Sequence, residues 1–170
     1  MAAEIRSLDS VDHAPGLKAL VRAYLSHELQ QLKEVSGLAL DLDTLLANTF
    51  DKVDSYLPPE GRLLVATERD GNEVGCVFLK MIRPDAAEIK RLYVVPGARG
   101  LGLGRRLMDD LLDQARTLGA KSILLDTGVY DVAAQALYRK LGFYEIDYYP
   151  EGENDPELTP YLVYMQLDLE

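Results

Sequence analysis

Residues 92–107 read LYVVPGARGLGLGRRL, a strand-like run that stops at a proline and turns through alternating glycines into a helix. Apolar residues then recur on one face of that helix, at Leu107, Met108, Leu111, Leu112, Ala115 and Leu118. Glycines in such a turn let a ligand approach the backbone, and the first helical N–H groups and the helix dipole attract anions. The stretch therefore predicts a pyrophosphate-sized anion site, and the alternative is a turn that needs glycine only for tight packing.

Two common phosphate motifs do not fit this turn. A dinucleotide fingerprint needs a third glycine three residues after Gly102, where the chain has Arg105. A Walker loop needs Gly-Lys followed by Ser or Thr, and the sequence has none. The spacing that is present is Arg99-x-x-Gly102-x-Gly104.

The rest of the chain alternates between strand and helix patterns. Predicted strands are residues 3–8, 62–68, 73–82, 88–96, 121–126, 143–149 and 161–168, and predicted helices are 14–33, 41–49, 101–118 and 131–141. Asp70-Gly71-Asn72 joins two of the strands as a hairpin turn. Antiparallel hairpins that lead into a strand-helix-strand unit predict an α/β fold with a mixed sheet that is parallel in part.

Composition places the chain among single-domain globular proteins. It has 170 residues, 48% of them hydrophobic, and no run near the ~20 apolar residues that a bilayer helix needs. We expect one domain over residues 1–170 and a cytoplasmic location, because the first ten residues lack a hydrophobic export signal. Cys76 is the single cysteine and lies in an apolar run, and His13 and His27 have no third ligand in register, so we expect no metal site.

The charge is unevenly distributed. The net charge is −10, but residues 61–142 carry 13 basic and 10 acidic side chains, whereas residues 143–170 carry no basic and 8 acidic ones. An acidic protein is a poor partner for nucleic acid or an anionic membrane, because both require basic neutralisation of phosphates. The basic middle favours a small anionic ligand, and the acidic flanks favour a cationic second substrate or are simply a solvated surface.

A second motif, AQALYRKLGF at residues 134–143, follows the glycine turn by about 30 residues. Together, Leu92-x-Val94-x-Pro96, Arg99-x-x-Gly102-x-Gly104 and this second motif resemble the signatures of the GCN5-related N-acetyltransferase (GNAT) superfamily over residues 60–168. The resemblance implies a central mixed, twisted sheet of about seven strands flanked by about four helices. It also implies acetyl-CoA as co-substrate. One departure is Asp131, where many members carry Asn.

The resemblance implies a set of cofactor-binding residues. The pantetheine amides would pair with the strand edge from Leu92 to Val94, and the glycine turn would hold the pyrophosphate. The Val94 N–H would donate to the thioester oxygen as negative charge develops. The implied residues are Leu92, Tyr93, Val94, Arg99, Gly100, Leu101, Gly102, Leu103, Gly104, Asp131 and Tyr138.

Amide formation from a thioester needs a neutral amine and a proton for the departing thiolate. Tyr138 is the candidate acid, and Glu88, eleven residues before Arg99, is the candidate base that removes the amine proton. The alternatives are a packed tyrosine and a strand-end carboxylate paired with Lys90 or Arg91. We expect Cys76 to be buried and acetyl transfer to be direct, within a ternary complex.

The acceptor is the least constrained part of the prediction. Candidate lining residues are Asp126, Asp131, Tyr148, Tyr149 and a lid that carries Asp41 and Asp43. We expect a primary amine of a small molecule, because no basic tail or recognition module is appended. The alternatives are a protein amine, a non-catalytic acyl-CoA sensor and a partner-binding domain; Tyr138 and Glu88 favour an enzyme. A homodimer is compatible with the sequence.

Overall fold

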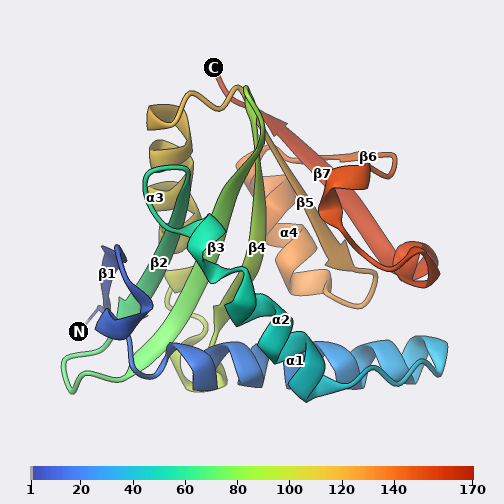
Figure 1. The fold of residues 1–170 in the computed structure, drawn as a ribbon, viewed down its shortest axis with the longest axis horizontal. Helices are drawn as coiled ribbons and strands as arrows, with labels where there is room; N and C mark the ends of the chain where they lie inside the picture. The colour runs from blue at the N-terminus through green and yellow to red at the C-terminus, as the bar shows by residue number, and fades with distance from the viewer. Residues whose placement is uncertain (1) are drawn as a thin grey trace.

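A seven-stranded mixed sheet forms the centre of the molecule in the computed structural model, which describes residues 2–170 (Figure 1). The strands are β1 (Glu4–Ser7), β2 (Gly61–Thr67), β3 (Glu73–Arg83), β4 (Ala86–Val94), β5 (Ser122–Gly128), β6 (Tyr144–Ile146) and β7 (Leu162–Asp168). Their order across the sheet is β1-β2-β3-β4-β5-β7-β6, and every neighbouring pair is antiparallel except β4 and β5. The mixed α/β prediction is confirmed.

Helices cover both faces of the sheet. Within residues 2–170 the four α-helices are α1 (Leu17–Ser36), α2 (Leu42–Asp51), α3 (Leu103–Thr117) and α4 (Val132–Leu141). Figure 1 shows α1 and α2 in front of the sheet and α3 and α4 behind it. Leu107 and Leu111 of α3 are fully buried against the strands, and each such side chain contributes about 1.5–3 kcal/mol relative to exposure. The helical spacing in the sequence therefore marks the buried face of α3.

Two local predictions differ from the structure. The strand predicted over 143–149 is only Tyr144–Ile146; residues 147–149 have no regular structure, and Pro150 then opens a 3₁₀ turn. The four-residue spacing of Arg106 and Asp110 predicts a pair along α3. Instead the Arg106 guanidinium donates a 3.0 Å hydrogen bond to the carbonyl of Ala3 and so ties α3 to the start of the chain.

The sheet opens between β4 and β5. These strands pair only from Ala86↔Ser122 to Glu88↔Leu124, and a bulge in β4 shifts its register against β3 between Cys76 and Phe78. Successive N–H groups of a strand point to opposite sides. Because the N–H of Val95 donates to Val74 beside it on the β3 side, the N–H of Val94 points toward the gap. The structure thus leaves an open strand edge at the centre of the sheet.

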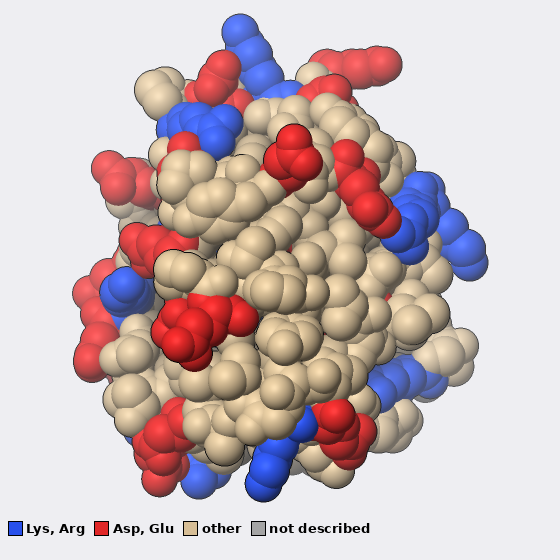
Figure 2. Space-filling view, turned by 90° about the vertical axis from the view of Figure 1, so that its right-hand side faces the viewer, with Lys and Arg blue, Asp and Glu red and all other residues tan. Residues whose placement is uncertain are grey.

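The surface charge is dispersed on the face shown in Figure 2. Acidic side chains are scattered over a largely uncharged surface, and basic side chains lie mostly at its margins. This face offers no continuous basic patch of the kind that binds a phosphate backbone. Of the helices in residues 2–170, none combines the length and the apolar character that crossing a bilayer requires.

Candidate active site

A cavity of about 490 Å³ occupies the gap between β4 and β5. Five parts of the chain line it: α1, the end of β4, the glycine turn, the end of β5 and the first turns of α4. Ten predicted cofactor residues lie in its wall, namely Leu92, Tyr93, Val94, Arg99, Gly100, Gly102, Leu103, Gly104, Asp131 and Tyr138. Leu101 does not, and its side chain is 81% exposed. The cavity therefore joins motifs that lie about 30 residues apart in the sequence.

The glycine turn presents backbone N–H groups to one end of this cavity. Gly100 and Gly102 have φ of 81° and 74°, left-handed conformations that glycine adopts without steric cost. Gly102 is the N-cap of α3, and no side chain caps that helix. The N–H of Arg106 donates to the carbonyl of Gly102, so the N–H groups of the three residues between them precede the first intrahelical bond. This end of the cavity has the chemistry of an anion site.

Arg99 lies beside the turn and is held in place by two contacts. Its Nε donates to the carbonyl of Val94 at 2.8 Å, and its guanidinium lies 5.6 Å from the ring centroid of Tyr93. These contacts fix a positive charge at the mouth of the anion site.

Tyr138 comes to the cavity from α4. It is 6% exposed, and its ring packs against Phe143, 5.6 Å between centroids. Burial, with further effects of Asp131, Glu28 and Asp126, raises the pKa of its hydroxyl. Tyr138 therefore stays protonated at neutral pH, as a proton donor must.

The model of the acetyltransferase (GNAT) family matches residues 24–143, well over half of the chain. The chain belongs to the GNAT family. It is 36% identical over 142 residues to an IAA acetyltransferase of Azospirillum brasilense, a match that covers 83% of this chain and 90% of that protein. Relatives of this GNAT chain are named N-acetyltransferases. The chain itself is an enzyme of the N-acetyltransferase class.

Solved structures have the same fold. A GNAT acetyltransferase from Staphylococcus aureus Mu50 superposes with a TM-score of 0.74 at 19% identity, over 98% of this chain and 100% of that one. An N-acetyltransferase from Thermoplasma acidophilum, solved in complex with coenzyme A, superposes with a TM-score of 0.71 at 20% identity, over 99% and 100%. The predicted GNAT fold is confirmed.

Glu28 is a cavity residue of this GNAT chain that the sequence analysis did not select. It projects from α1 and lies beside Asp131 and Tyr130 in the cavity wall. Burial, followed by the nearby charge of Asp131, raises the pKa of the Glu28 carboxyl to about 8. Asp131 itself accepts hydrogen bonds from the Thr127 hydroxyl at 3.1 Å and the Gly128 N–H at 3.0 Å. Two carboxyl groups thus meet in the cavity, and the negative charge of Asp131 opposes ionisation of Glu28.

Asp131 lies at the start of α4 without capping that helix through its side chain. It occupies the N-cap position, but its carboxylate makes no capping hydrogen bond to the helix. The bonds from Thr127 and Gly128 turn the carboxylate back toward β5. Its charge is therefore available to the cavity.

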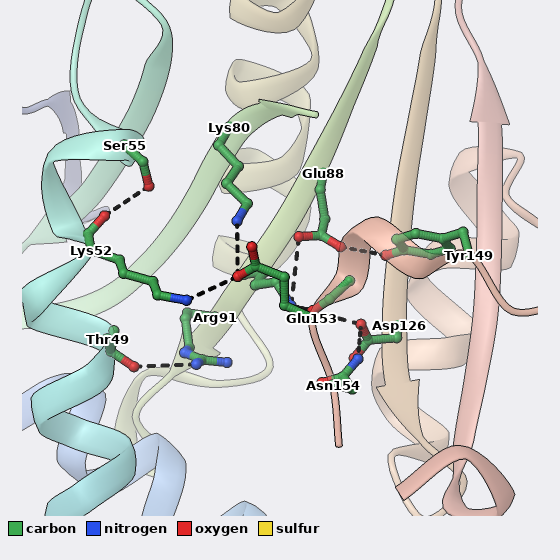
Figure 3. Close-up of polar contacts among 12 residues, drawn as sticks. Thr49, Lys52, Ser55, Lys80, Glu88, Arg91, Asp126, Tyr149, Glu153 and Asn154 are labelled. Atoms are coloured by element: carbon green, nitrogen blue, oxygen red, sulfur yellow. Dashed lines mark hydrogen bonds and ion pairs between the residues drawn. The ribbon is translucent and has the colours of Figure 1, made fainter. Parts of the chain in front are cut away.

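Glu88, the predicted base, does not lie in the cavity wall of the GNAT chain. Its side chain is 0% exposed, and the hydroxyl of Tyr149 donates to its Oε2 at 2.7 Å. Figure 3 shows the Tyr149 hydroxyl pointing at Glu88. The Lys90 Nζ lies 3.5 Å from Oε1 of Glu88, so the alternative of a carboxylate paired with Lys90 describes this contact. Burial raises the pKa of the Glu88 carboxyl, and Lys90 opposes that shift.

The predicted acceptor residues separate into two groups. Asp126 lies in the cavity wall, where it accepts a 2.8 Å hydrogen bond from Asn154. The cavity wall does not include the other four, Tyr148, Tyr149, Asp41 and Asp43. The hydroxyl of Tyr149 donates to Glu88 instead. Asp41 caps α2, and Asp43 forms an ion pair with an arginine of α1. Helix α1 contributes Tyr24, His27 and Glu28 to the wall in their place.

Cys76 is buried, as expected. Its side chain is 0% exposed on β3, and burial raises the pKa of its thiol to about 12. Because the nucleophilic form is the thiolate, this residue is inert at neutral pH.

Proposed function

We propose that the protein transfers the acetyl group of acetyl-CoA to a primary amine of a small molecule, by direct attack within a ternary complex. One observation supports this proposal: an anion site, an open strand edge, a protonated tyrosine and a pair of carboxyl groups all line the same cavity. These parts correspond to the pyrophosphate, the pantetheine arm, the thiolate leaving group and the amine.

The glycine turn and Arg99 would hold the pyrophosphate through backbone N–H groups and one guanidinium. The edge of β4 from Leu92 to Val94 would pair with the pantetheine amides in the manner of an added strand. Coenzyme A supplies the activated acetyl group as a thioester. The Val94 N–H, which points into the gap, supports a role as donor to the thioester oxygen.

The reaction forms a C–N bond and breaks the C–S bond of the thioester. The amine nitrogen attacks the carbonyl carbon, and the tetrahedral intermediate collapses with loss of the thiolate. Tyr138 donates a proton to the thiolate, since its raised pKa keeps the hydroxyl protonated. The nitrogen of the tetrahedral intermediate loses one proton as the amide forms, and that proton restores the Tyr138 hydroxyl. The other proton to be removed is the one that the ammonium must lose before it can attack.

We assign removal of that proton to the pair of Glu28 and Asp131. Both carboxyl groups lie in the cavity wall with Tyr138, whereas Glu88 lies outside it. An ammonium beside Glu28 and Asp131 favours the ionised form of the Glu28 carboxyl, so a proton on that carboxyl is released to solvent as the substrate enters. The Glu28 carboxylate then takes one proton from the ammonium and passes it to solvent.

A thiol-release assay over a panel of amines tests the function. The compound in the name of the IAA acetyltransferase, IAA, is assayed beside the panel. We expect thiol release with at least one small amine. Calorimetry with acetyl-CoA separates the alternatives: tight binding without turnover across the panel indicates a sensor, and absence of binding indicates a packing module. Turnover confined to peptides indicates a protein acetyltransferase.

A further inference from the structure

Arg91 differs from the other cations on its side of the sheet. Lys52 and Lys80 both lie within 4 Å of Glu153, at 3.1 and 3.9 Å, and Lys90 lies near Glu88 and Asp126. Among residues 2–170, the structure places no carboxylate within ion-pair distance of Arg91. Within that range the guanidinium makes one hydrogen bond, which Figure 3 shows and which runs from Nη2 to the hydroxyl of Thr49 at 3.2 Å.

The surroundings of Arg91 make this lack of a partner costly. Its Nε is buried and has no hydrogen-bond partner in the described part of the chain. A guanidinium that is partly removed from water is stable only where acceptors replace the lost hydration. Arg91 also lines the cavity, so a ligand in the cavity is in a position to supply those acceptors.

The backbone holds Arg91 in this position. It lies in the β4 bulge with φ of 59°, a left-handed conformation that costs a non-glycine residue about 1–2 kcal/mol. Bulges redirect side chains, and unfavourable backbone conformations are concentrated at functional sites. The ring of Tyr24 lies 5.9 Å from the guanidinium and restricts it further. The chain thus places an unpaired guanidinium in the cavity by means of an unfavourable conformation.

The cavity also contains the opposite charge. Glu28 and Asp131 form its acidic pair, and Tyr24 is close enough to both carboxyl groups and to Arg91 for all three charges to affect its hydroxyl. One ligand of modest size can therefore contact Arg91 and the acidic pair at the same time. A ligand that satisfies Arg91 and the pair must carry an anionic group and a cationic group.

We propose that the acceptor is an amino acid or a similar small aminocarboxylate, whose carboxylate binds Arg91 while its amino group faces Glu28 and Asp131. This proposal rests on the proposed acetyltransferase function. A guanidinium and a carboxylate match as two parallel hydrogen bonds, which orients the amine as well as binding it. Acetylation converts the ammonium to a neutral amide, so the product loses its attraction to the acidic pair and leaves.

The test compares matched substrates in the thiol-release assay. The panel contains the common amino acids, each beside its decarboxylated amine and its methyl ester. We expect a kcat/KM about 10- to 100-fold higher for the preferred amino acid than for either analogue, as for other hydrogen bonds between charged groups. Equal or faster turnover of the analogues overturns the proposal, and so does acetyl-CoA binding without turnover of any aminocarboxylate.

Variants of Arg91 locate the carboxylate site. Arg91→Met should lower kcat/KM for the amino acid about 10- to 100-fold and leave that for the decarboxylated amine within about threefold, while Arg91→Lys should restore part of the loss. Arg69→Met, in the exposed β2–β3 turn, is the matched control. An equal loss for both substrates overturns the assignment. If Arg91→Met does not fold, the wild-type substrate comparison decides alone.

Calorimetry separates failure of this proposal from failure of the function. Acetyl-CoA should bind wild-type protein and Arg91→Met with similar affinity, because Arg91 is assigned to the acceptor. Absence of acetyl-CoA binding to the wild type contradicts the proposed function itself.

Discussion

The hydroxyl of Tyr149 donates a 2.7 Å hydrogen bond to Oε2 of Glu88, a carboxyl group with a fully buried side chain. The bond joins the loop before β7 to the point where β4 and β5 separate. Lys90 adds an ion pair on the other oxygen at 3.5 Å. These contacts hold Glu88 outside the cavity wall. We therefore expect substitution of Glu88 to affect catalysis differently from substitution of Glu28.

The two glutamates should therefore respond differently to the same change. Glu28→Gln should lower kcat about 10²- to 10⁴-fold, the usual effect of losing a general base, whereas Glu88→Gln should lower it less than about tenfold. Steady-state thiol release measures both, and thermal unfolding confirms that each variant is folded. The reverse order of effects would return the role of base to Glu88.

The pH dependence of kcat/KM should report the acidic pair. The Glu28 carboxyl, with a pKa of about 8, must be ionised to attract and deprotonate the amine, so kcat/KM should rise with pH through about 8. The groups that face it are Asp131, Tyr130, Tyr24 and Arg91. Asp131→Asn removes a neighbouring negative charge and should move the rise to lower pH. A profile that Asp131→Asn leaves unmoved would contradict the pairing.

Tyr138→Phe should lower kcat by about 10²- to 10⁴-fold, because the thiolate would leave without a positioned proton donor. The ring and its packing on Phe143 remain, so acetyl-CoA affinity measured by calorimetry should change less than about threefold. Tyr144→Phe is the control, since Tyr144 is exposed and its hydroxyl bonds Asp168. Normal turnover of Tyr138→Phe would remove this residue from the mechanism.

The residues predicted to bind the cofactor lie in the cavity wall more often than those predicted to line the acceptor site. The glycine turn and the motif around Tyr138 are contiguous segments, so local sequence patterns are enough to select them. Glu28 had one local signal: it lies on the apolar face of α1, three residues after Leu25 and four before Leu32. Its partner Asp131 is about 100 residues away in the sequence. The two residues become neighbours only because α1 packs across the gap between β4 and β5, so the sequence alone does not reveal the pair.

Arg91 gave no sequence signal of its role. The residue reads as the middle of a strand, and its left-handed backbone arises from a register shift between two strands. Most strand and helix positions, by contrast, were predictable because turn residues and apolar periodicity are local. The short β6 was not, since its extent depends on pairing with β7.

Gly104→Leu should abolish acetyl-CoA binding without unfolding the protein. Gly104 lines the cavity in the first turn of α3, and a Cβ there makes an ordinary 3.6 Å contact with Leu137. Replacing a helical glycine stabilises a helix by roughly 0.5–1 kcal/mol, so loss of binding cannot be attributed to a weaker fold. Gly97→Leu is the matched control, because Gly97 lies outside the cavity wall and a Cβ added there meets nothing within 4 Å. Calorimetry that finds unchanged affinity for Gly104→Leu would refute the anion site.

Cys76→Ala should leave the rate of thiol release within about twofold, because a buried thiol with a pKa of about 12 has almost no thiolate at neutral pH. The change removes one sulfur atom from the buried cluster that also contains Tyr93, so the free energy of unfolding should fall by about 1 kcal/mol. Chemical denaturation measures this cost, and steady-state kinetics at a temperature well below the transition measures the rate. Retained folding with loss of activity would indicate a covalent acetyl-cysteine intermediate and contradict direct transfer. An unchanged rate leaves the amine of the acceptor as the group that attacks the thioester.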